Sequence, residues 1–193
     1  MSPAASRREA GLARRLKSVR LLLLDVDGVL TDGGIYYTER DEEMKRFDIK
    51  DGMGIDLLKR AGIDVGILTG RTSKIVERRA RELGMTVLKQ GFYDKSAGFE
   101  EILAERELTE AEIAYIGDDI LDLAVMRRVA FRACPADAVD EVKAEAHYVC
   151  SSGGGHGAVR EVADLILRLR GLKEGAVGEA ARAGVKARRR VER

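Results

Sequence analysis

The chain has 193 residues, of which 45% are hydrophobic and 35% charged, a balance typical of one soluble domain with its own core. The formal net charge of +1 gives no electrostatic reason to expect nucleic acid as the main ligand. No apolar run approaches the roughly 20 residues that span a bilayer, so we expect no membrane span. Cys134 and Cys150 form no Cys-x-x-Cys motif, which favours two reduced, buried thiols in a cytoplasmic protein.

The start of the chain, residues 1–18, is polar and basic, and we expect an extension that is a frayed helix or disordered. The first predicted strand, about Arg20 to Val26, contains four consecutive leucines and is typical of a strand buried on both faces. At its end, Asp25 and Asp27 can turn toward one site while Val26 stays in the core. An acidic turn without further function would leave the same pattern.

Residues 34–49 predict a β-hairpin. Ile35 to Thr38 is rich in strand formers, Glu39 to Glu43 is a charged connector, and Met44 to Ile49 can form a second strand. An isolated hairpin is marginal in water, so this one should contact its own subunit's core or a neighbouring subunit.

Beyond the hairpin, predicted helices alternate with strands. The expected strands cover residues 63–68, 86–88, 113–116, 129–134 and 147–150. The expected helices cover residues 50–60, 72–83, 94–105, 122–128, 137–146 and 158–172, with a short helical turn at 109–112. This alternation predicts a mostly parallel sheet with helices on both faces, a Rossmann-like three-layer α/β sandwich.

The predicted domain covers residues 19–172, with no repeat and no room for a large cap domain. A glycine-rich loop, Gly153 to Gly157, precedes its last helix and can either offer backbone N–H groups to an anion or serve as a tight connector. Residues 173–193 are rich in Ala, Gly and Arg, and we expect a basic, disordered tail there.

Polar residues follow three of the predicted strands, and a lysine follows shortly after a further one. In a parallel sheet these strand ends share one edge, which gathers acids, one hydroxyl and one ammonium. The members of this set are Asp25, Asp27, Thr69, Lys95, Asp118 and Asp119.

Such a set supports phosphoryl transfer. Clustered carboxylates need a cation, and their hard oxygen ligands suit Mg²⁺. Together with Lys95, that cation can neutralise a phosphate, while Thr69 donates a hydrogen bond. One carboxylate can attack phosphorus and a second can protonate the leaving group. Taken singly, each residue also has an ordinary structural explanation, such as a helix cap or a surface lysine.

The motifs around these residues resemble the four motifs of the haloacid dehalogenase superfamily of phosphatases. The chain resembles in particular the family that acts on 3-deoxy-D-manno-octulosonate 8-phosphate (KDO 8-phosphate), over about residues 19–171. The motifs that carry the resemblance are Asp25-Val26-Asp27-Gly28-Val29-Leu30-Thr31-Asp32-Gly33, Lys50-Asp51-Gly52, Thr69-Gly70-Arg71, Gln90-Gly91, Lys95, Gly117-Asp118-Asp119-x-x-Asp122 and Gly154-x-x-Gly157-Ala158-Val159-Arg160-Glu161.

The resemblance implies a role for each acid. Asp25 would be the nucleophile and a Mg²⁺ ligand. Asp27 would be the acid/base and would bind Mg²⁺ through its backbone carbonyl. Asp118 would be the second carboxylate ligand, with Asp119 and Asp122 supporting the metal. The implied reaction releases phosphate through an aspartyl-phosphate, in the route to the sugar acid of lipopolysaccharide.

The resemblance also implies how the substrate is held. Thr69 and Lys95 would hold the phosphate. Arg71, beside Gly70, would favour the eight-carbon substrate, because relatives acting on a nine-carbon keto-acid 9-phosphate have glutamate there. The family assembles as a homotetramer in which hairpins pair, and Arg79 would reach a neighbour's site to bind the sugar-acid carboxylate.

Three other interpretations stay open. The chain could be a phosphatase of another sugar-acid phosphate, including the nine-carbon one. It could be a non-catalytic tetramerisation module, although the residues named above are all present. It could be a phospho-receiver domain, which would explain neither the second acid, Asp27, nor the hairpin.

Overall fold

The computed structural model describes the backbone of residues 3–40 and 42–191, and the side chains of residues 6–40 and 42–183. Its main sheet has six parallel strands in the spatial order β5-β4-β1-β6-β7-β8. The strands are β1 (Leu21–Leu24), β4 (Asp64–Leu68), β5 (Val87–Lys89), β6 (Ile113–Ile116), β7 (Phe131–Cys134) and β8 (Tyr148–Val149).

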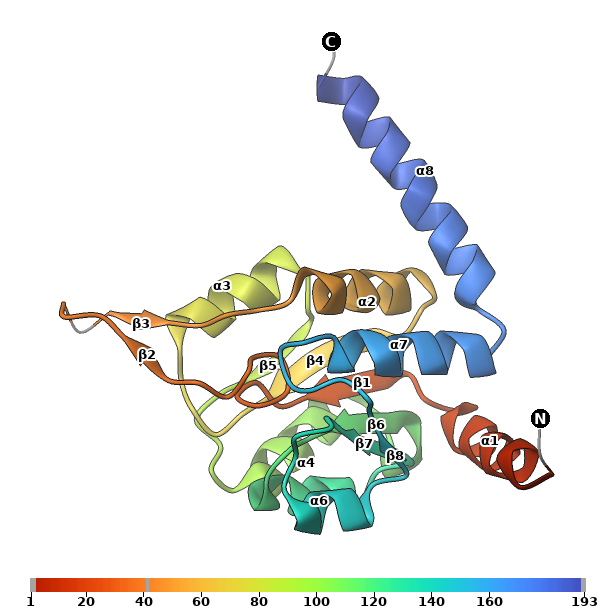
Figure 1. Ribbon diagram of the computed structural model, residues 1–193, viewed down its shortest axis with the longest axis horizontal. Helices are drawn as coiled ribbons and strands as arrows, with labels where there is room; N and C mark the ends of the chain where they lie inside the picture. Colours follow the sequence, from red (N-terminus) through yellow and green to blue (C-terminus); the bar gives the residue numbers. More distant parts are fainter. Residues whose placement is uncertain (1–2, 41, 192–193) are drawn as a thin grey trace.

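Helices cover both faces of this sheet, so the predicted three-layer sandwich is confirmed (Figure 1). One face carries α1 (Pro3–Leu16), α2 (Ile49–Arg60), α3 (Lys74–Glu82) and α7 (Ala158–Leu169). The other carries α4 (Lys95–Arg106), α5 (Leu123–Met126) and α6 (Asp140–Glu145). The 3₁₀ turns are η1 (Glu110–Glu112) and η2 (Ile120–Asp122).

The leucines of β1 divide between the two cores. Leu22 and Leu24 lie in the cluster beneath α2 and α7, whereas Leu21 and Leu23 lie in the cluster beneath α4 and α5. All four are fully buried, because successive side chains of a strand point to opposite faces and both faces are covered. The central strand is thereby fixed on both sides, and the loop at its end starts from a rigid base.

The N-terminal segment differs from the expectation of a frayed or disordered extension. Residues 3–16 form α1, which packs against α7. Its apolar side chains explain the difference, because Leu12 and Leu16 are both buried in the core cluster. Residues 1–2 of the predicted extension lie outside the described residues.

The expectation of a disordered tail is wrong for most of the segment, since Lys173–Val191 form the helix α8, which extends away from the body (Figure 1). Alanine, glutamate, lysine and arginine favour helix, and the start of α8 packs on α2 and α7. Ala176 and Ala180, one helical turn apart, both contact the core cluster. Residues 192–193 lie outside the described part.

The predicted hairpin is present and projects from the body (Figure 1), but its paired strands are short. Strand β2 (Tyr36–Tyr37) pairs antiparallel with β3 (Glu43–Met44), and Asp41 of the predicted connector lies outside the described residues. The second strand ends early because Asp48 caps α2, its Oδ1 accepting from the backbone N–H of Lys50 at 2.6 Å. Residues 45–48 therefore form an irregular segment that leads from β3 into α2.

None of the helices described is both long and apolar enough to cross a membrane. Both cysteines are buried and unpaired. Burial raises the pKa of Cys134 to about 11, so this thiol is protonated at neutral pH.

Candidate active site

The loop after β1 places the first two carboxylates. The backbone N–H of Asp25 still bonds to β6, donating to Ile116 O at 3.0 Å, and Val26 is fully buried. The Val26 carbonyl then accepts from the N–H groups of Leu30 and Thr31, at 2.9 and 3.0 Å, which closes a tight turn. As the sequence predicts, Val26 stays in the core, and Asp25 lies at the carboxyl edge of the sheet.

Lys95 is the first residue of α4, and its side chain is only 3% exposed. Its Nζ lies 2.9 Å from Asp25 Oδ2 and 2.6 Å from Asp122 Oδ1. Burial alone would lower the pKa of Lys95, but the two carboxylates outweigh it and raise the pKa above its usual value. A permanent ammonium is therefore fixed beside Asp25.

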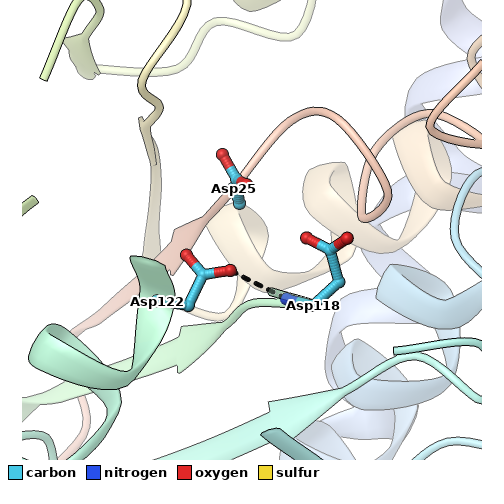
Figure 2. Close-up of side chains that lie close together, drawn as sticks. All are labelled: Asp25, Asp118 and Asp122. Carbon is cyan, nitrogen blue, oxygen red and sulfur yellow. Dashed lines mark hydrogen bonds between the residues drawn. The ribbon is translucent and has the colours of Figure 1, made fainter. Parts of the chain in front are cut away.

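Asp122 organises this part of the site and is fully buried. Its Oδ1 accepts from Lys95 and from the Tyr115 hydroxyl, both at 2.6 Å. Its Oδ2 accepts from the backbone N–H groups of Asp118 and Asp119, at 2.8 and 3.1 Å; Figure 2 shows the first of these bonds. Both oxygens are thus engaged, which suits Asp122 to support other groups.

Asp118 follows β6 and faces Asp25 across the site (Figure 2). One oxygen of each carboxylate, Asp25 Oδ1 and Asp118 Oδ1, is buried without a hydrogen-bond partner. Gly28, at φ +86°, leaves space beside Asp118, because a Cβ there would lie 2.0 Å from Asp118 Oδ2. A buried carboxylate oxygen without a partner is costly, so this pair of oxygens can accept a ligand.

The charge balance indicates that this ligand is a cation. Oxygen atoms of Asp25, Asp118 and Asp122 lie within 4.8 Å of one another, and Lys95 is the one ammonium beside them among the described residues. Burial raises the pKa of Asp25 to about 6. Lys95 acts against this shift and repulsion from Asp122 adds to it. Burial and then repulsion from Asp25 and Asp122 raise the pKa of Asp118 to about 8.

These oxygens fit a hard divalent cation such as Mg²⁺, which prefers carboxylate ligands and would relieve the repulsion. Asp25 and Asp118 have the free oxygens to hold it. The Asp27 carboxylate is not in this cluster, so a part for Asp27 in metal binding rests on its backbone carbonyl, as the resemblance implies.

Asp27 turns toward the hairpin instead. Its Oδ1 is ion-paired with Lys45 Nζ, and its Oδ2 lies 3.9 Å from Arg71 Nε. Lys45 Nζ is also 3.4 Å from Glu43 Oε1, and Glu43 in turn accepts from Arg71 Nη2 at 3.1 Å and from the Ser73 hydroxyl at 3.1 Å. The hairpin of this subunit therefore reaches the predicted acid/base.

The remaining predicted residues fall into two groups. Thr69, which follows β4, is 3% exposed at the same sheet edge, and Gly70 comes next with ordinary space around its Cα. Arg79 contacts residues outside the acidic site. It lies over the Phe47 ring, 5.7 Å from its centroid, and its Nη1 is 3.4 Å from Glu82 Oε2.

Comparison with known proteins decides the family. The chain is 47% identical over 165 residues to 3-deoxy-D-manno-octulosonate 8-phosphate phosphatase KdsC of Yersinia pestis, a match covering 86% of this chain and 88% of that protein. No family model matches the chain. The chain belongs to the KDO 8-phosphate phosphatase family.

Solved structures agree with this assignment. The phosphatase of this family from Moraxella catarrhalis, in complex with magnesium ion, phosphate ion and KDO, superimposes with a TM-score of 0.84 at 36% identity. That match covers 87% of this chain and 97% of the other. A Legionella pneumophila structure assigned to subfamily III A of the haloacid dehalogenase superfamily gives 0.91 at 35% identity, covering 94% and 100%.

In this family member the glycine-rich loop acts as a tight connector. The backbone N–H groups of Gly154 and Gly155 donate to Asp137 Oδ1 and Val29 O, both at 3.0 Å, and are not free for an anion. A Cβ on Gly154 would lie 1.9 Å from Gly28 O, so only glycine fits where the loop touches the site. The Asp119 side chain caps the turn that follows it, since its Oδ1 accepts from Ile120 N–H at 2.7 Å.

Three site residues, Glu43, Lys45 and Tyr115, were not predicted from the sequence. Glu43 and Lys45 are two positions apart on an extended segment, so they share a side, and that spacing was a usable signal. Tyr115 is the one hydroxyl in a fully buried strand, β6, where a polar group requires a partner.

Proposed function

We propose that this chain is a Mg²⁺-dependent phosphomonoesterase that hydrolyses KDO 8-phosphate to KDO and phosphate. The observation that carries the proposal is the buried Asp25, held at 2.9 Å by Lys95 and facing the unpartnered oxygen of Asp118. The name of the Y. pestis relative and the magnesium, phosphate and KDO in the M. catarrhalis complex support it.

In the first half-reaction a carboxylate oxygen of Asp25 attacks phosphorus and forms an aspartyl-phosphate, while the bond from phosphorus to the sugar oxygen breaks. Asp27 gives its proton to the departing sugar oxygen, so the product leaves as an alcohol. Lys95 and Thr69 hold the phosphoryl oxygens as charge shifts onto the leaving group.

In the second half-reaction Asp27, now ionised, takes a proton from water, and the water oxygen attacks phosphorus. The bond to Asp25 breaks, which releases phosphate and restores both carboxyl groups. Mg²⁺ bound by Asp25, the Asp27 carbonyl and Asp118 would neutralise phosphate charge, with Asp122 and Asp119 fixing the loop that carries Asp118.

Arg71 supports the eight-carbon substrate. Its side chain is 37% exposed beside Asp27, where a substrate carboxylate can replace part of its contact with Glu43. A nine-carbon keto-acid 9-phosphate is the main competing substrate, and Gly70 leaves the backbone accessible to either.

We also propose a cytoplasmic homotetramer paired through the hairpins, with Arg79 and the far side of each hairpin facing a neighbour. On that hairpin Ile35 is 57%, Tyr37 is 67% and Met44 is 53% exposed, an apolar surface that association would cover. Sedimentation should show a tetramer, and a monomer would contradict this part.

The test is phosphate release by the purified protein from KDO 8-phosphate, the nine-carbon 9-phosphate and 4-nitrophenyl phosphate, each with Mg²⁺ or a chelator. We expect Mg²⁺-dependent release with strong preference for KDO 8-phosphate. Preference for another phosphate would change the substrate assignment. No phosphate release from any of the three would favour a non-catalytic tetramerisation module.

A further inference from the structure

The hairpin sends two side chains of opposite charge into the site. Glu43 in β3 and Lys45 just after it lie on the same side of the chain, while Met44 between them is exposed. The Lys45 side chain is only 3% exposed, so its ammonium is almost wholly removed from solvent. A lysine is buried in this way only with charged partners, and here they are Asp27 and Glu43.

These contacts close into a ring of alternating charge, which we call the ionic ring: Asp27, Lys45, Glu43 and Arg71. Lys45 joins Asp27 Oδ1 to Glu43, Glu43 joins Lys45 to Arg71 at 3.1 Å, and Arg71 Nε returns to Asp27 Oδ2 at 3.9 Å. Each oxygen of the Asp27 carboxylate therefore faces a different cation. Ser73, whose hydroxyl donates to Glu43, anchors the ring to the start of α3.

We propose that Lys45 and Glu43 are positioning residues that aim the Asp27 carboxyl at the leaving-group oxygen, so that the hairpin is part of the catalytic machinery of its own subunit. This inference rests on the proposed function, in which Asp27 is the acid/base.

The physical reason lies in the freedom that Asp27 would otherwise have. Its side chain is 25% exposed and stands on a loop, and the described contacts that hold its oxygens come from Lys45 and Arg71. General acid catalysis needs the acid within hydrogen-bond reach of the leaving oxygen, and a displacement of about 1 Å costs about 10²-fold in rate. Loss of the lysine would let the carboxyl rotate away.

Protonation of the leaving group distinguishes positioning of an acid from general support of the fold. A sugar alkoxide leaves poorly without a proton, whereas 4-nitrophenolate is a stable anion and leaves without one. The comparison must report the first half-reaction, because Asp27 also activates water in the second, which is common to both esters. The ratio kcat/KM reports the steps up to departure of the leaving group. A residue that only positions Asp27 should therefore change kcat/KM for the sugar phosphate and hardly for the aryl phosphate. A residue that supports the fold or the metal should affect both equally.

The experiment compares kcat/KM for KDO 8-phosphate and 4-nitrophenyl phosphate in Lys45→Met, Lys45→Arg and Glu43→Gln, with ribose 5-phosphate as a second alkyl ester. For Lys45→Met we expect kcat/KM to fall about 10²-fold on the alkyl esters and less than about threefold on the aryl ester. Lys45→Arg keeps the charge and should recover most of the loss. Lys50→Met, an exposed lysine just beyond the hairpin, is the matched control and should change neither rate.

Glu43→Gln keeps Lys45 and provides a second reading should Lys45→Met fold poorly, as its melting temperature would reveal. We expect the same bias toward loss on alkyl esters, about tenfold, with an unchanged melting temperature. Equal losses on alkyl and aryl esters, or no loss in either variant, would overturn the proposal. A wild-type enzyme that cleaves ribose 5-phosphate but not KDO 8-phosphate would overturn only the substrate assignment. The loss on the alkyl ester relative to the aryl ester can still be measured with ribose 5-phosphate. Release from none would overturn both.

Discussion

The group of charged residues at the sheet edge and the ionic ring differ in burial and in charge balance. The sheet-edge group is almost enclosed, with side-chain exposures of 1% for Asp122, 3% for Lys95 and 11% for Asp25. In the ionic ring, Asp27 and Arg71 are 25% and 37% exposed. The sheet-edge group, with Asp118 as its fourth member, has three acids to one cation, whereas the ionic ring is balanced with two of each.

This difference separates the group that attacks phosphorus from the group that aims the acid/base and meets the rest of the substrate. An enclosed group with excess negative charge is fixed in advance and needs a cation, which suits attack on phosphorus in any phosphomonoester. In the balanced ionic ring the more exposed Arg71 can exchange a partner for a substrate group, while the buried Lys45 keeps Asp27 aimed.

Asp25→Asn should reduce phosphate release from every substrate by about 10⁴-fold or more, because the amide cannot act as the nucleophile. The shape of the side chain is kept and one buried negative charge is removed, so the fold should survive. Phosphate release together with circular dichroism checks this, and substantial retained turnover would refute the assignment of Asp25.

Asp122→Asn should lower the free energy of unfolding by about 3 kcal/mol and also lower turnover on all substrates. All the groups around Asp122 donate hydrogen bonds, so an amide N–H₂ in place of one oxygen would face donors. Urea unfolding measures the change. Asp140→Asn, on the surface of α6, is the control and should stay within about 0.5 kcal/mol; equal effects would contradict the central role of Asp122.

Gly154→Ala should cost about 1–3 kcal/mol, because its Cβ would meet Gly28 O at 1.9 Å and Thr31 O at 2.9 Å and push the catalytic loop. Gly175→Ala is matched to it, since no atom lies within 4 Å of the added Cβ and the site is helical. That variant should gain up to about 1 kcal/mol. A similar loss in both would mean that the close contact with Gly28 is not the cause.

Metal and pH should act together on stability. The folded pKa values of Asp25 and Asp118, about 6 and about 8, lie above their ordinary 3.8, so the metal-free folded state binds more protons than the unfolded state. This contribution to stability is complete below about pH 4 and is lost as pH rises through 6 and then 8.

Mg²⁺ binds the ionised carboxylates, so the rise in melting temperature that it causes should grow from pH 5.5 to pH 8.5, by several degrees. Thermal unfolding with Mg²⁺ and with a chelator measures this rise, and Asp118→Asn is the control that should flatten it. A rise that is the same at each pH would show that these carboxylates do not hold the metal.

The sequence predicts the buried side of the molecule better than the exposed side. Four leucines followed by Asp-Val-Asp predict a strand covered on both faces with its acids at its end, and the structure has this arrangement. The glycine-rich loop stays ambiguous in the sequence, since only the position of Gly28 shows that Gly154 must lack a side chain.

The tail and the hairpin depend on contacts that the sequence does not display. The glycines and basic charge of the tail led to the prediction of disorder, and the packing of Ala176 and Ala180 on the core favours the helix there. In the sequence Glu43 belongs to the charged connector of the predicted hairpin and Lys45 to its second strand, and only the structure shows Lys45 beside Asp27. Pairs so far apart in the chain are set by tertiary structure, which local pattern does not report.

Rapid acid quenching of the enzyme during turnover of KDO 8-phosphate with Mg²⁺, followed by peptide mass spectrometry, tests whether Asp25 is the nucleophile. We expect a phosphoryl group on Asp25, absent in Asp25→Asn and absent when a chelator replaces Mg²⁺. Turnover with a phosphoryl group on another residue, or turnover that continues in Asp25→Asn, would contradict this assignment.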